Sequence, residues 1–226
     1  MAAIFFDLDG TLTDPFEGVA RSMAFAFEGL GLDVPDGDEL RAMIGPPLQV
    51  SLSRRFGGDR ALAGEIVRRF RVRYGDTGMF ENVVYPGVRE MLAALGRAAT
   101  LFVCTSKPHA YAGPILRRFG LDGAFARVYG SELDGARIHK PELLAHALAA
   151  EGITGGADVA LLGDRELDVA AARANGICAW GAAWGYGTRD ELEAAGADRV
   201  FHAPHDVTAA FTTSWGHPPG DPIGCG

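Results

Sequence analysis

Short apolar segments alternate with helical patterns along most of this chain, and this alternation limits the folds that the sequence can adopt. Residues 3–8 form a nearly continuous apolar run, which is typical of a strand buried on both faces of a parallel sheet. In the helical pattern of residues 87–96, Val88, Met91 and Leu95 recur on one face. Alternating elements of this kind predict an α/β fold with a doubly wound, Rossmann-like parallel sheet. Further strands are expected at 100–104, 127–129, 158–162, 177–181 and 199–201, and further helices at 109–119, 141–151 and 166–175.

Residues 15–82 interrupt this alternation with a helical pattern. Val19, Met23 and Phe27 mark one amphipathic helix, and two similar patterns follow it. An insertion that follows the first strand is well placed to cover a site at the end of that strand. The predicted organisation is a small α-helical cap at 15–82, an α/β core at 1–14 and 83–215, and a flexible C-terminal tail at 216–226.

Charge and composition restrict the partners of the chain. Its 226 residues carry a formal net charge of −8, which disfavours nucleic acid because binding to a phosphate backbone requires a basic face. No stretch approaches the roughly 18 apolar residues of a transmembrane helix, and the N-terminus lacks the basic region of a secretory signal. Three scattered cysteines favour a reducing compartment. We therefore expect a cytoplasmic monomer or homodimer that binds neither nucleic acid nor membrane.

Polar residues gather at the ends of the predicted strands, and the first such group runs from Asp7 to Thr11. In an open α/β sheet the carboxyl ends of the strands form the edge where ligands bind. Asp7 and Asp9 come at the end of the first strand, and Gly10 permits a sharp exit of the chain. Two carboxylates so placed can reach one pocket. A strand followed by an ordinary Asp-Gly turn would show the same pattern.

Two later segments have the same placement. Thr105 and Ser106 follow the strand at 100–104, where hydroxyls and backbone amides can bind phosphate oxygens or cap the next helix. Lys140 precedes a helix, and a lysine there is usually solvated. Of the 21 basic residues, however, only Lys107 and Lys140 are lysine. A compact ammonium that neutralises one phosphoryl oxygen is a reason to place a lysine at position 140.

A fourth segment supplies two more carboxylates. Asp164 follows the strand at 158–162, and Asp168 lies one helical turn later on the same face. An aspartate that caps the helix, with a surface acid behind it, would give the same pattern. That alternative explains this segment alone better than it explains all four segments together.

Electrostatics connects the four segments. A phosphate dianion beside Asp7, Asp9 and Asp164 gathers a formal charge of about −5, and each like-charge pair near 4 Å costs about 4 kcal/mol at an effective dielectric of 20. Lys140 supplies only one positive charge, so the cluster needs a further cation. A few carboxylates together with substrate oxygens and waters suit Mg²⁺. The sequence therefore predicts Mg²⁺ as the cofactor and a small phosphorylated metabolite as the partner.

These residues resemble the motifs of the haloacid dehalogenase-like hydrolase superfamily. The resemblance spans residues 4–199 and follows the family's motif order. Finer features are similar to its phosphoglycolate-phosphatase-like branch. The four motifs match Asp7-Leu8-Asp9-Gly10-Thr11, Thr105, Lys140, and Gly163-Asp164 with Asp168, and the finer features are Ile44-Gly45-Pro46-Pro47-Leu48, Tyr85-Pro86-Gly87, Thr105-Ser106-Lys107-Pro108 and Gly130-Ser131-Glu132-Leu133-Asp134-Gly135.

The resemblance implies a Mg²⁺-dependent phosphatase that works through an aspartyl-phosphate. Asp7 would be the nucleophile, and Asp9 would protonate the leaving alcohol and then deprotonate the attacking water. The phosphoryl group would be bound by Thr105, Ser106 and Lys140. The ligands of Mg²⁺ would be Asp7, Asp9 through its carbonyl, and Asp164, with Asp168 in support.

The substrate stays open at this point. Gly45 and Pro46 of the cap are the residues we expect at the leaving group. Phosphoglycolate is the default by resemblance, and a nucleoside monophosphate or another phosphorylated metabolite is the alternative. A phosphomutase of the same superfamily would carry an Arg- and Ser-rich cap segment where this chain has Gly45-Pro46-Pro47-Leu48-Gln49.

Two further alternatives are proteins that do not hydrolyse a phosphate ester. A signalling receiver domain would place its phosphorylated aspartate after a later strand and would need no helical insertion, so Asp7 argues against it. A phosphate-binding protein would need the phosphate-contacting groups and not the nucleophile. The sequence contains every group that catalysis requires, which favours the enzyme.

Overall fold

A parallel sheet forms the centre of the α/β part of the molecule. A computed structural model describes residues 2–215, so the tail predicted at 216–226 lies outside the described residues. Within residues 2–215, six strands pair in parallel in the order β5-β4-β1-β6-β7-β8. These strands are β1 (Ala3–Phe6), β4 (Thr100–Pro108), β5 (Arg127–Ser131), β6 (Gly156–Gly163), β7 (Ile177–Ala182) and β8 (Arg199–Phe201).

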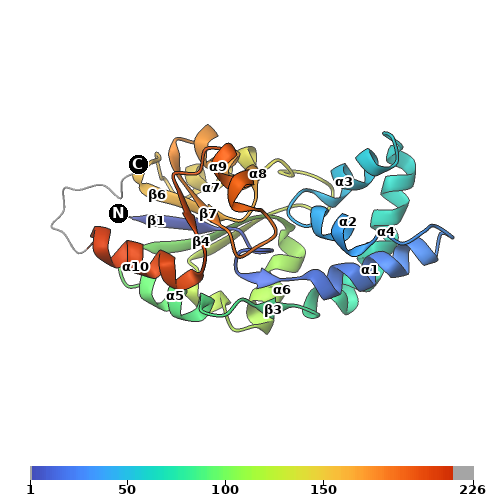
Figure 1. Ribbon diagram of the computed structural model, residues 1–226, viewed down its shortest axis with the longest axis horizontal. Coiled ribbons are helices and arrows are strands. Elements are labelled where there is room, and N and C mark those ends of the chain that lie inside the picture. Colours follow the sequence, from blue (N-terminus) through green and yellow to red (C-terminus); the bar gives the residue numbers. More distant parts are fainter. Residues whose placement is uncertain (1, 216–226) are drawn as a thin grey trace.

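Helices cover both faces of this sheet (Figure 1). On β1, Ile4 and Phe6 belong to the hydrophobic cluster of one face, and Ala3 and Phe5 belong to that of the other face. This alternation makes the strand apolar at every position, as expected for a sheet that is covered on both sides. The doubly wound α/β fold predicted from the sequence is confirmed. The helices of the first face are α5 (Val88–Leu95), α6 (His109–Arg118) and α10 (Pro204–Trp215), and those of the second face are α7 (Lys140–Ala150), α8 (Glu166–Ala174) and α9 (Arg189–Ala194).

Four helices between β1 and β4 form a separate bundle, which we call the cap. It lies beyond the end of the sheet toward which β1 runs (Figure 1). Its own hydrophobic cluster includes the fully buried Met23, Phe27, Leu52 and Ile66. The exact boundaries at 14/15 and 82/83 stay predictions. The cap helices are α1 (Phe16–Glu28), α2 (Gly37–Ala42), α3 (Leu48–Arg55) and α4 (Arg60–Asp76).

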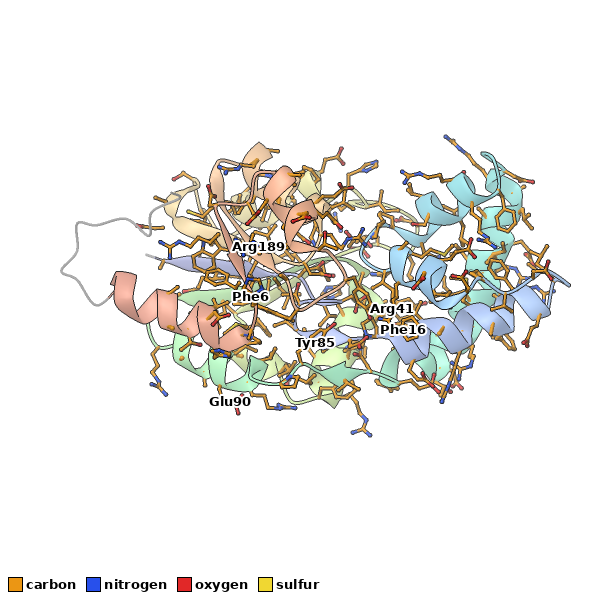
Figure 2. All side chains as sticks on the ribbon, viewed as in Figure 1. Phe6, Phe16, Arg41, Tyr85, Glu90 and Arg189 are labelled. Carbon is orange, nitrogen blue, oxygen red and sulfur yellow. The ribbon has the colours of Figure 1, made fainter. Side chains whose placement is uncertain are left out.

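Short elements join the cap to the sheet. The segment that enters the cap and the segment that leaves it pair as an antiparallel ribbon. They are β2 (Thr13–Asp14) and β3 (Val83–Val84). One 3₁₀ turn, η1 (Gly78–Phe80), follows α4, and another, η2 (Asp122–Ala124), follows α6. The helix α2 was not predicted, because Leu40 is its only buried residue. It packs on α1 through the guanidinium of Arg41, which lies 4.2 Å from the ring centre of Phe16 (Figure 2).

The first strand is shorter than predicted, and the difference positions the site. Strand β1 ends at Phe6, whereas the apolar run continues to Leu8. The Leu8 carbonyl accepts hydrogen bonds from the backbone N–H groups of Leu12 (2.9 Å) and Thr13 (3.0 Å), so the chain turns there. Asp7 and Asp9 therefore stand in a tight loop at the end of the sheet. None of the helices within residues 2–215 is both long and apolar enough to cross a membrane.

Candidate active site

The candidate site lies at the carboxyl ends of three adjacent strands. Strand β1 pairs with β4 on one side and with β6 on the other, so the segments that follow these strands meet at one edge. Asp7 follows β1, Thr105 lies near the end of β4, and Asp164 follows β6. Neighbours of the first strand that lie far apart in the sequence create the crevice where open α/β sheets bind ligands.

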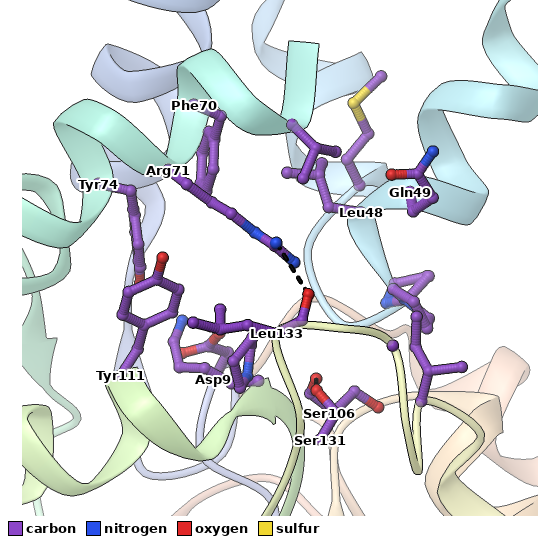
Figure 3. Close-up of a pocket in the computed structure, with 18 of the residues that line it drawn as sticks. Asp9, Leu48, Gln49, Phe70, Arg71, Tyr74, Ser106, Tyr111, Ser131 and Leu133 are labelled. Carbon is purple, nitrogen blue, oxygen red and sulfur yellow. Dashed lines mark hydrogen bonds and ion pairs between the residues drawn. The ribbon is translucent and has the colours of Figure 1, made fainter. Parts of the chain in front are cut away.

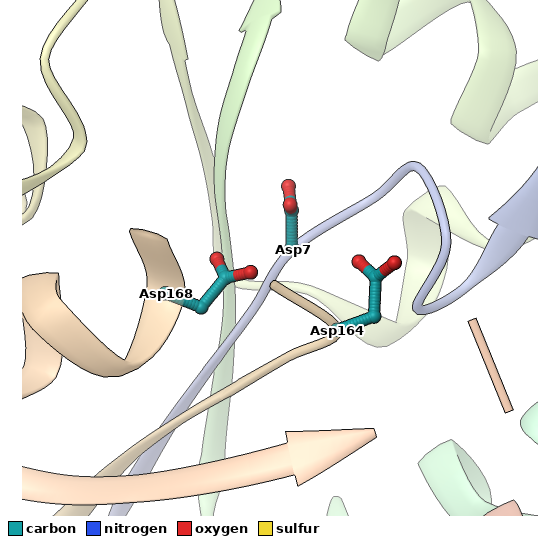
Figure 4. Close-up of side chains that lie close together, drawn as sticks. All are labelled: Asp7, Asp164 and Asp168. Atoms are coloured by element: carbon teal, nitrogen blue, oxygen red, sulfur yellow. The ribbon is translucent and has the colours of Figure 1, made fainter. Parts of the chain in front are cut away.

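Three aspartates converge at this edge (Figure 4). One carboxylate oxygen from each of Asp7, Asp164 and Asp168 lies within 4.8 Å of the others, and all three side chains are buried. The hydroxyl of Thr11 donates to Asp164 Oδ1 (3.3 Å), and the backbone N–H of Tyr186 donates to Asp164 Oδ2 (2.8 Å). These bonds fix the Asp164 carboxylate in place.

Lys140 is the cation of this cluster. Its ammonium lies 2.6 Å from Asp7 Oδ2 and also contacts Asp168 Oδ1. The residue starts α7 and is only 4% exposed, so its charge is withdrawn from water. Burial alone would lower the pKa of Lys140, but the carboxylates of Asp168 and Asp7 outweigh burial and raise it. Lys140 is therefore held as a cation at the site.

The balance of charge at the cluster fits a divalent metal. Burial, and then the neighbouring Asp168 and Asp7 charges, raise the pKa of Asp164 well above its usual value. Burial also raises the pKa of Asp168 to about 6, although Lys140 opposes the change. Both shifts reflect the cost of placing three carboxylates against one ammonium in a buried place, which a bound cation would relieve, and all the donors are oxygens. Such a donor set suits Mg²⁺, so Asp7, Asp164 and Asp168 are residues that could hold it.

The backbone packs tightly around Asp164. Gly10 has a φ of +81°, a conformation that favours glycine. A Cβ atom at Gly10 would overlap the Asp164 carboxylate, and one at Gly187 would overlap the Asp164 carbonyl oxygen. Two loops thus close directly on this aspartate, and neither has room for a side chain there.

Asp9 lies apart from the three clustered aspartates and faces a different partner. Its Oδ2 contacts the ammonium of Lys107, and this ion pair joins the loop after β1 to the end of β4. Burial raises the pKa of Asp9, and the Lys107 charge opposes this effect. The other oxygen, Asp9 Oδ1, is buried and has no hydrogen-bond partner among the described residues.

A cavity of about 330 Å³ opens between the cap and the sheet (Figure 3). Asp9 and Ser106 line its floor, and Gly45 and Pro46 line it from the cap. Asp7, Thr105 and Lys140 are not among the lining residues. The Thr105 hydroxyl is buried and accepts a hydrogen bond from the backbone N–H of Lys107 (3.2 Å). The structure thus brings the predicted residues to one edge, where some border the cavity and others lie behind its floor. The cap wall is largely apolar and includes Met43, Ile44, Leu48, Val67, Phe70 and Tyr74.

Two arginines tie the cap to the sheet. Arg71 of α4 donates to the carbonyl oxygen of Leu133 in the loop after β5 (2.9 Å; Figure 3). Arg165, just before α8, donates to the carbonyl oxygen of Ile44 (2.8 Å). The cap therefore sits closed over the cavity in this structure, with Asp9 beneath it.

Sequence reasoning missed several residues of this site. Lys107 has the same signal that drew attention to Lys140, because both are rare lysines placed before a proline. Arg71, Arg165 and Tyr186 have no comparable signal. Their positions depend on how the cap folds back over the sheet, which a local pattern does not specify.

Comparison with known proteins identifies the family. A family model described as haloacid dehalogenase-like hydrolase matches residues 1–176. The chain is 47% identical over 192 residues to a 5'-nucleotidase of Pseudomonas aeruginosa, covering 84% of this chain and 86% of that protein. It is 33% identical to a phosphoglycolate phosphatase of Caulobacter vibrioides, covering 94% and 91%.

Solved structures show the same architecture. A crystal structure of a predicted phosphatase from Clostridium acetobutylicum superposes with a TM-score of 0.89 at 32% identity, covering 94% of this chain and 98% of that one. The family resemblance drawn from the four motifs is confirmed. The chain therefore belongs to the haloacid dehalogenase-like hydrolases and is a phosphatase of that family.

Proposed function

We propose that this chain hydrolyses a small phosphate monoester with Mg²⁺, and that Asp7 is the nucleophile. One observation carries the proposal. The buried Asp7 carboxylate lies 2.6 Å from the Lys140 ammonium and shares one cluster with Asp164 and Asp168, next to the cavity that Asp9 borders. A nucleophile, a countercharge, an acid–base group and an oxygen-rich metal site thus lie together.

The metal would be held by Asp7, the carbonyl oxygen of Asp9, and Asp164, with Asp168 in support. When bound, Mg²⁺ supplies charge neutralisation for the phosphoryl oxygens. The cost of placing three buried carboxylates against one ammonium, which a bound cation would relieve, supports this assignment. A receiver-like domain would require neither the cavity nor the closed cap above it.

The residues of the chain account for both chemical steps. In the first, an Asp7 oxygen bonds to phosphorus, the ester P–O bond breaks, and the leaving oxygen takes a proton from Asp9. In the second, Asp9 takes a proton from water as the water oxygen bonds to phosphorus and the Asp7–phosphorus link breaks. Thr105 and the Ser106 amide would hold the phosphoryl group, and Lys140 would offset its charge.

For the leaving group we favour a nucleoside, so that the substrate is a nucleoside monophosphate. A cavity of about 330 Å³ with a largely apolar cap wall exceeds what glycolate needs. Of the two cationic side chains that line it, Lys107 pairs with Asp9, and Arg71 donates a hydrogen bond to the carbonyl oxygen of Leu133. The relative named 5'-nucleotidase supports the same choice.

Phosphoglycolate is the second candidate, supported by the relative named phosphoglycolate phosphatase. A kinetic comparison separates the two. With Mg²⁺ present, we expect kcat/KM for nucleoside 5'-monophosphates to exceed that for phosphoglycolate by at least about 10-fold. A higher kcat/KM for phosphoglycolate would reverse the choice of substrate. If no phosphate monoester were hydrolysed, the proposed function itself would be wrong.

A further inference from the structure

Lys107 occupies a position that the chemistry described so far does not use. Its side chain is 6% exposed, and its ammonium contacts Asp9 Oδ2 across 98 residues of sequence. Desolvating a lysine and a carboxylate together is costly, and an ion pair is weak support for a fold by itself. The pair therefore calls for a role beyond stability.

The two carboxylate oxygens of Asp9 have different surroundings. Lys107 holds Oδ2, whereas Oδ1 is buried without a hydrogen-bond partner among the described residues. Asp9 lines the cavity, but its Oδ1 atom itself exposes almost no surface in this structure. A buried acceptor left open in this way is unfavourable unless a ligand or water satisfies it.

Lys107 itself is held by the cap. Its ammonium lies 5.0 Å from the ring centre of Tyr74, which belongs to α4 and is almost completely buried. The face of an aromatic ring attracts a cation, most strongly where water is excluded. Tyr74 in turn stacks on Phe70 (4.9 Å between ring centres) and meets Tyr111 of α6 edge-on (5.4 Å). The arrangement around Asp9 thus includes one residue from the cap and is complete only when the cap packs on the sheet.

We propose that Lys107 is a positioning residue that holds Asp9 by Oδ2 and so fixes the orientation of the carboxyl group that exchanges the proton, and that Tyr74 makes this contact depend on the closed cap. This inference rests on the proposed function, in which Asp9 is the acid–base group. The proton passes from the Asp9 carboxyl group to the leaving oxygen as the ester bond breaks. It is replaced when Asp9 accepts a proton from the attacking water. Lys107 keeps its own protons throughout.

A purely structural role for Lys107 makes a different prediction. If the ion pair only stabilised the fold, its loss would slow all substrates by a common factor. If the ion pair orients Asp9 as the general acid, its loss slows most strongly those esters whose leaving oxygen needs a proton. An alkyl phosphate has a basic leaving oxygen that needs protonation, whereas p-nitrophenolate leaves readily without it.

The test measures the single-turnover rate of Asp7 phosphorylation in Lys107→Met with Mg²⁺ present. For an alkyl ester such as a nucleoside 5'-monophosphate, we expect this rate to fall by about 100-fold. For p-nitrophenyl phosphate it should fall by less than about 5-fold, since no acid is required. Hydrolysis of the aspartyl-phosphate should also slow, so that p-nitrophenol is released in a burst. Lys107→Arg, which keeps the cation, should recover part of the rate with the alkyl ester.

Two further variants make the result decisive. Arg68→Met removes a long cation from the same helix as Tyr74, at a side chain that is exposed and pairs with Glu65 of that helix, and it should leave the ratio of the aryl to the alkyl rate unchanged. Tyr74→Leu retains the ion pair but removes the aromatic face, and it should shift that ratio in the same direction as Lys107→Met. Tyr74→Leu also serves as the test if Lys107→Met does not fold.

The outcomes separate this inference from the function beneath it. If the wild-type protein hydrolyses esters but Lys107→Met and Tyr74→Leu slow aryl and alkyl esters equally, Lys107 is structural and the inference is overturned. If the wild-type protein forms no phosphorylated Asp7 at all, the proposed function fails first.

Discussion

Arg165 donates a hydrogen bond from its Nη1 to the carbonyl oxygen of Ile44, which links the start of α8 to the cap across 121 residues of sequence. The Arg165 side chain also pairs with Glu191 through Nε (2.8 Å), and the backbone N–H of Arg165 donates to Asp168 Oδ2 (3.0 Å). One residue therefore contacts the aspartate cluster, the sheet side of the molecule and the cap.

Arg165→Met should weaken closure of the cap. We expect KM for the preferred ester to rise by about 10-fold, because a lost charge-assisted hydrogen bond of about 1.4 kcal/mol corresponds to that factor. Steady-state kinetics will measure the change. Arg173→Met, at the far end of α8, is a matched control, since Arg173 pairs with Asp198. An equal rise of KM in both variants would contradict a role of Arg165 in closure.

Asp7→Asn should abolish turnover and leave the fold intact. The amide is nearly the same size as the carboxylate but cannot attack phosphorus, so kcat/KM should fall by more than about 10⁴-fold. Asp158→Asn makes the same change on an exposed aspartate of β6 and should have no effect on kcat/KM. Comparable activity in Asp7→Asn and the wild type would refute Asp7 as the nucleophile.

Mg²⁺ should stabilise the protein as well as activate it. A ligand at about 100 times its dissociation constant adds about 2.7 kcal/mol, which for a chain of this size raises Tm by about 5–10 °C. Thermal unfolding with MgCl₂, against NaCl of equal ionic strength, measures this shift without any substrate.

Asp164→Asn should raise the Mg²⁺ concentration needed for half of the Tm shift by at least about 10-fold. EDTA should abolish hydrolysis of the ester, and added Mg²⁺ should restore it. A Tm that does not respond to Mg²⁺ in the wild type would count against the metal site, whatever the activity shows.

Glu81 should make the stability of the protein depend on pH in acid. It accepts two hydrogen bonds from Arg73 (2.8 and 3.0 Å) and one from Arg21 (2.8 Å). Hydrogen bonds from Arg73 lower the pKa of Glu81 from 4.5 to about 2; burial opposes this change, and the hydrogen bond from Arg21 adds to it. A lowered folded-state pKa stabilises the fold above the unfolded value, and this contribution is lost as pH falls from about 4.5 toward 2.

The measurement is Tm as a function of pH for the wild type and Glu81→Gln. The difference between them should be largest at neutral pH and should shrink below about pH 4.5. Glu90→Gln, on the exposed side of α5, serves as the control and should follow the wild type. A constant difference between wild type and Glu81→Gln down to pH 2 would show that the ion pairs of Glu81 do not set the acid response.

The sheet and the edge where its polar residues meet could be predicted because both follow from local patterns. A buried parallel strand is apolar at every position, as in β1, so its boundaries can be read to within two residues. The carboxyl ends of such strands meet at one edge, which places Asp7 beside Asp164 whatever happens in the cap. The family followed from the same four motifs.

The closed cap and its contacts could not be predicted in this way. Whether Lys107 points at Asp9 or at solvent depends on Tyr74, which lies on a helix that the sequence alone does not orient. Arg71 is one of many arginines on amphipathic helices, and only the packing of α4 against the loop after β5 gives it a partner. Long-range contacts between the cap and the sheet leave little trace in sequence spacing.

The crowding of Gly10 and Gly187 against Asp164 has a consequence for how this enzyme can diversify. Neither position can accept even a methyl group without displacing Asp164. Active variants selected from a library that is randomised at these two positions should therefore carry only glycine there. The apolar cap wall of the cavity carries no such constraint, and its side chains can change size one at a time. New leaving groups can therefore be acquired through the cap, while the loops around the aspartates tolerate almost no change.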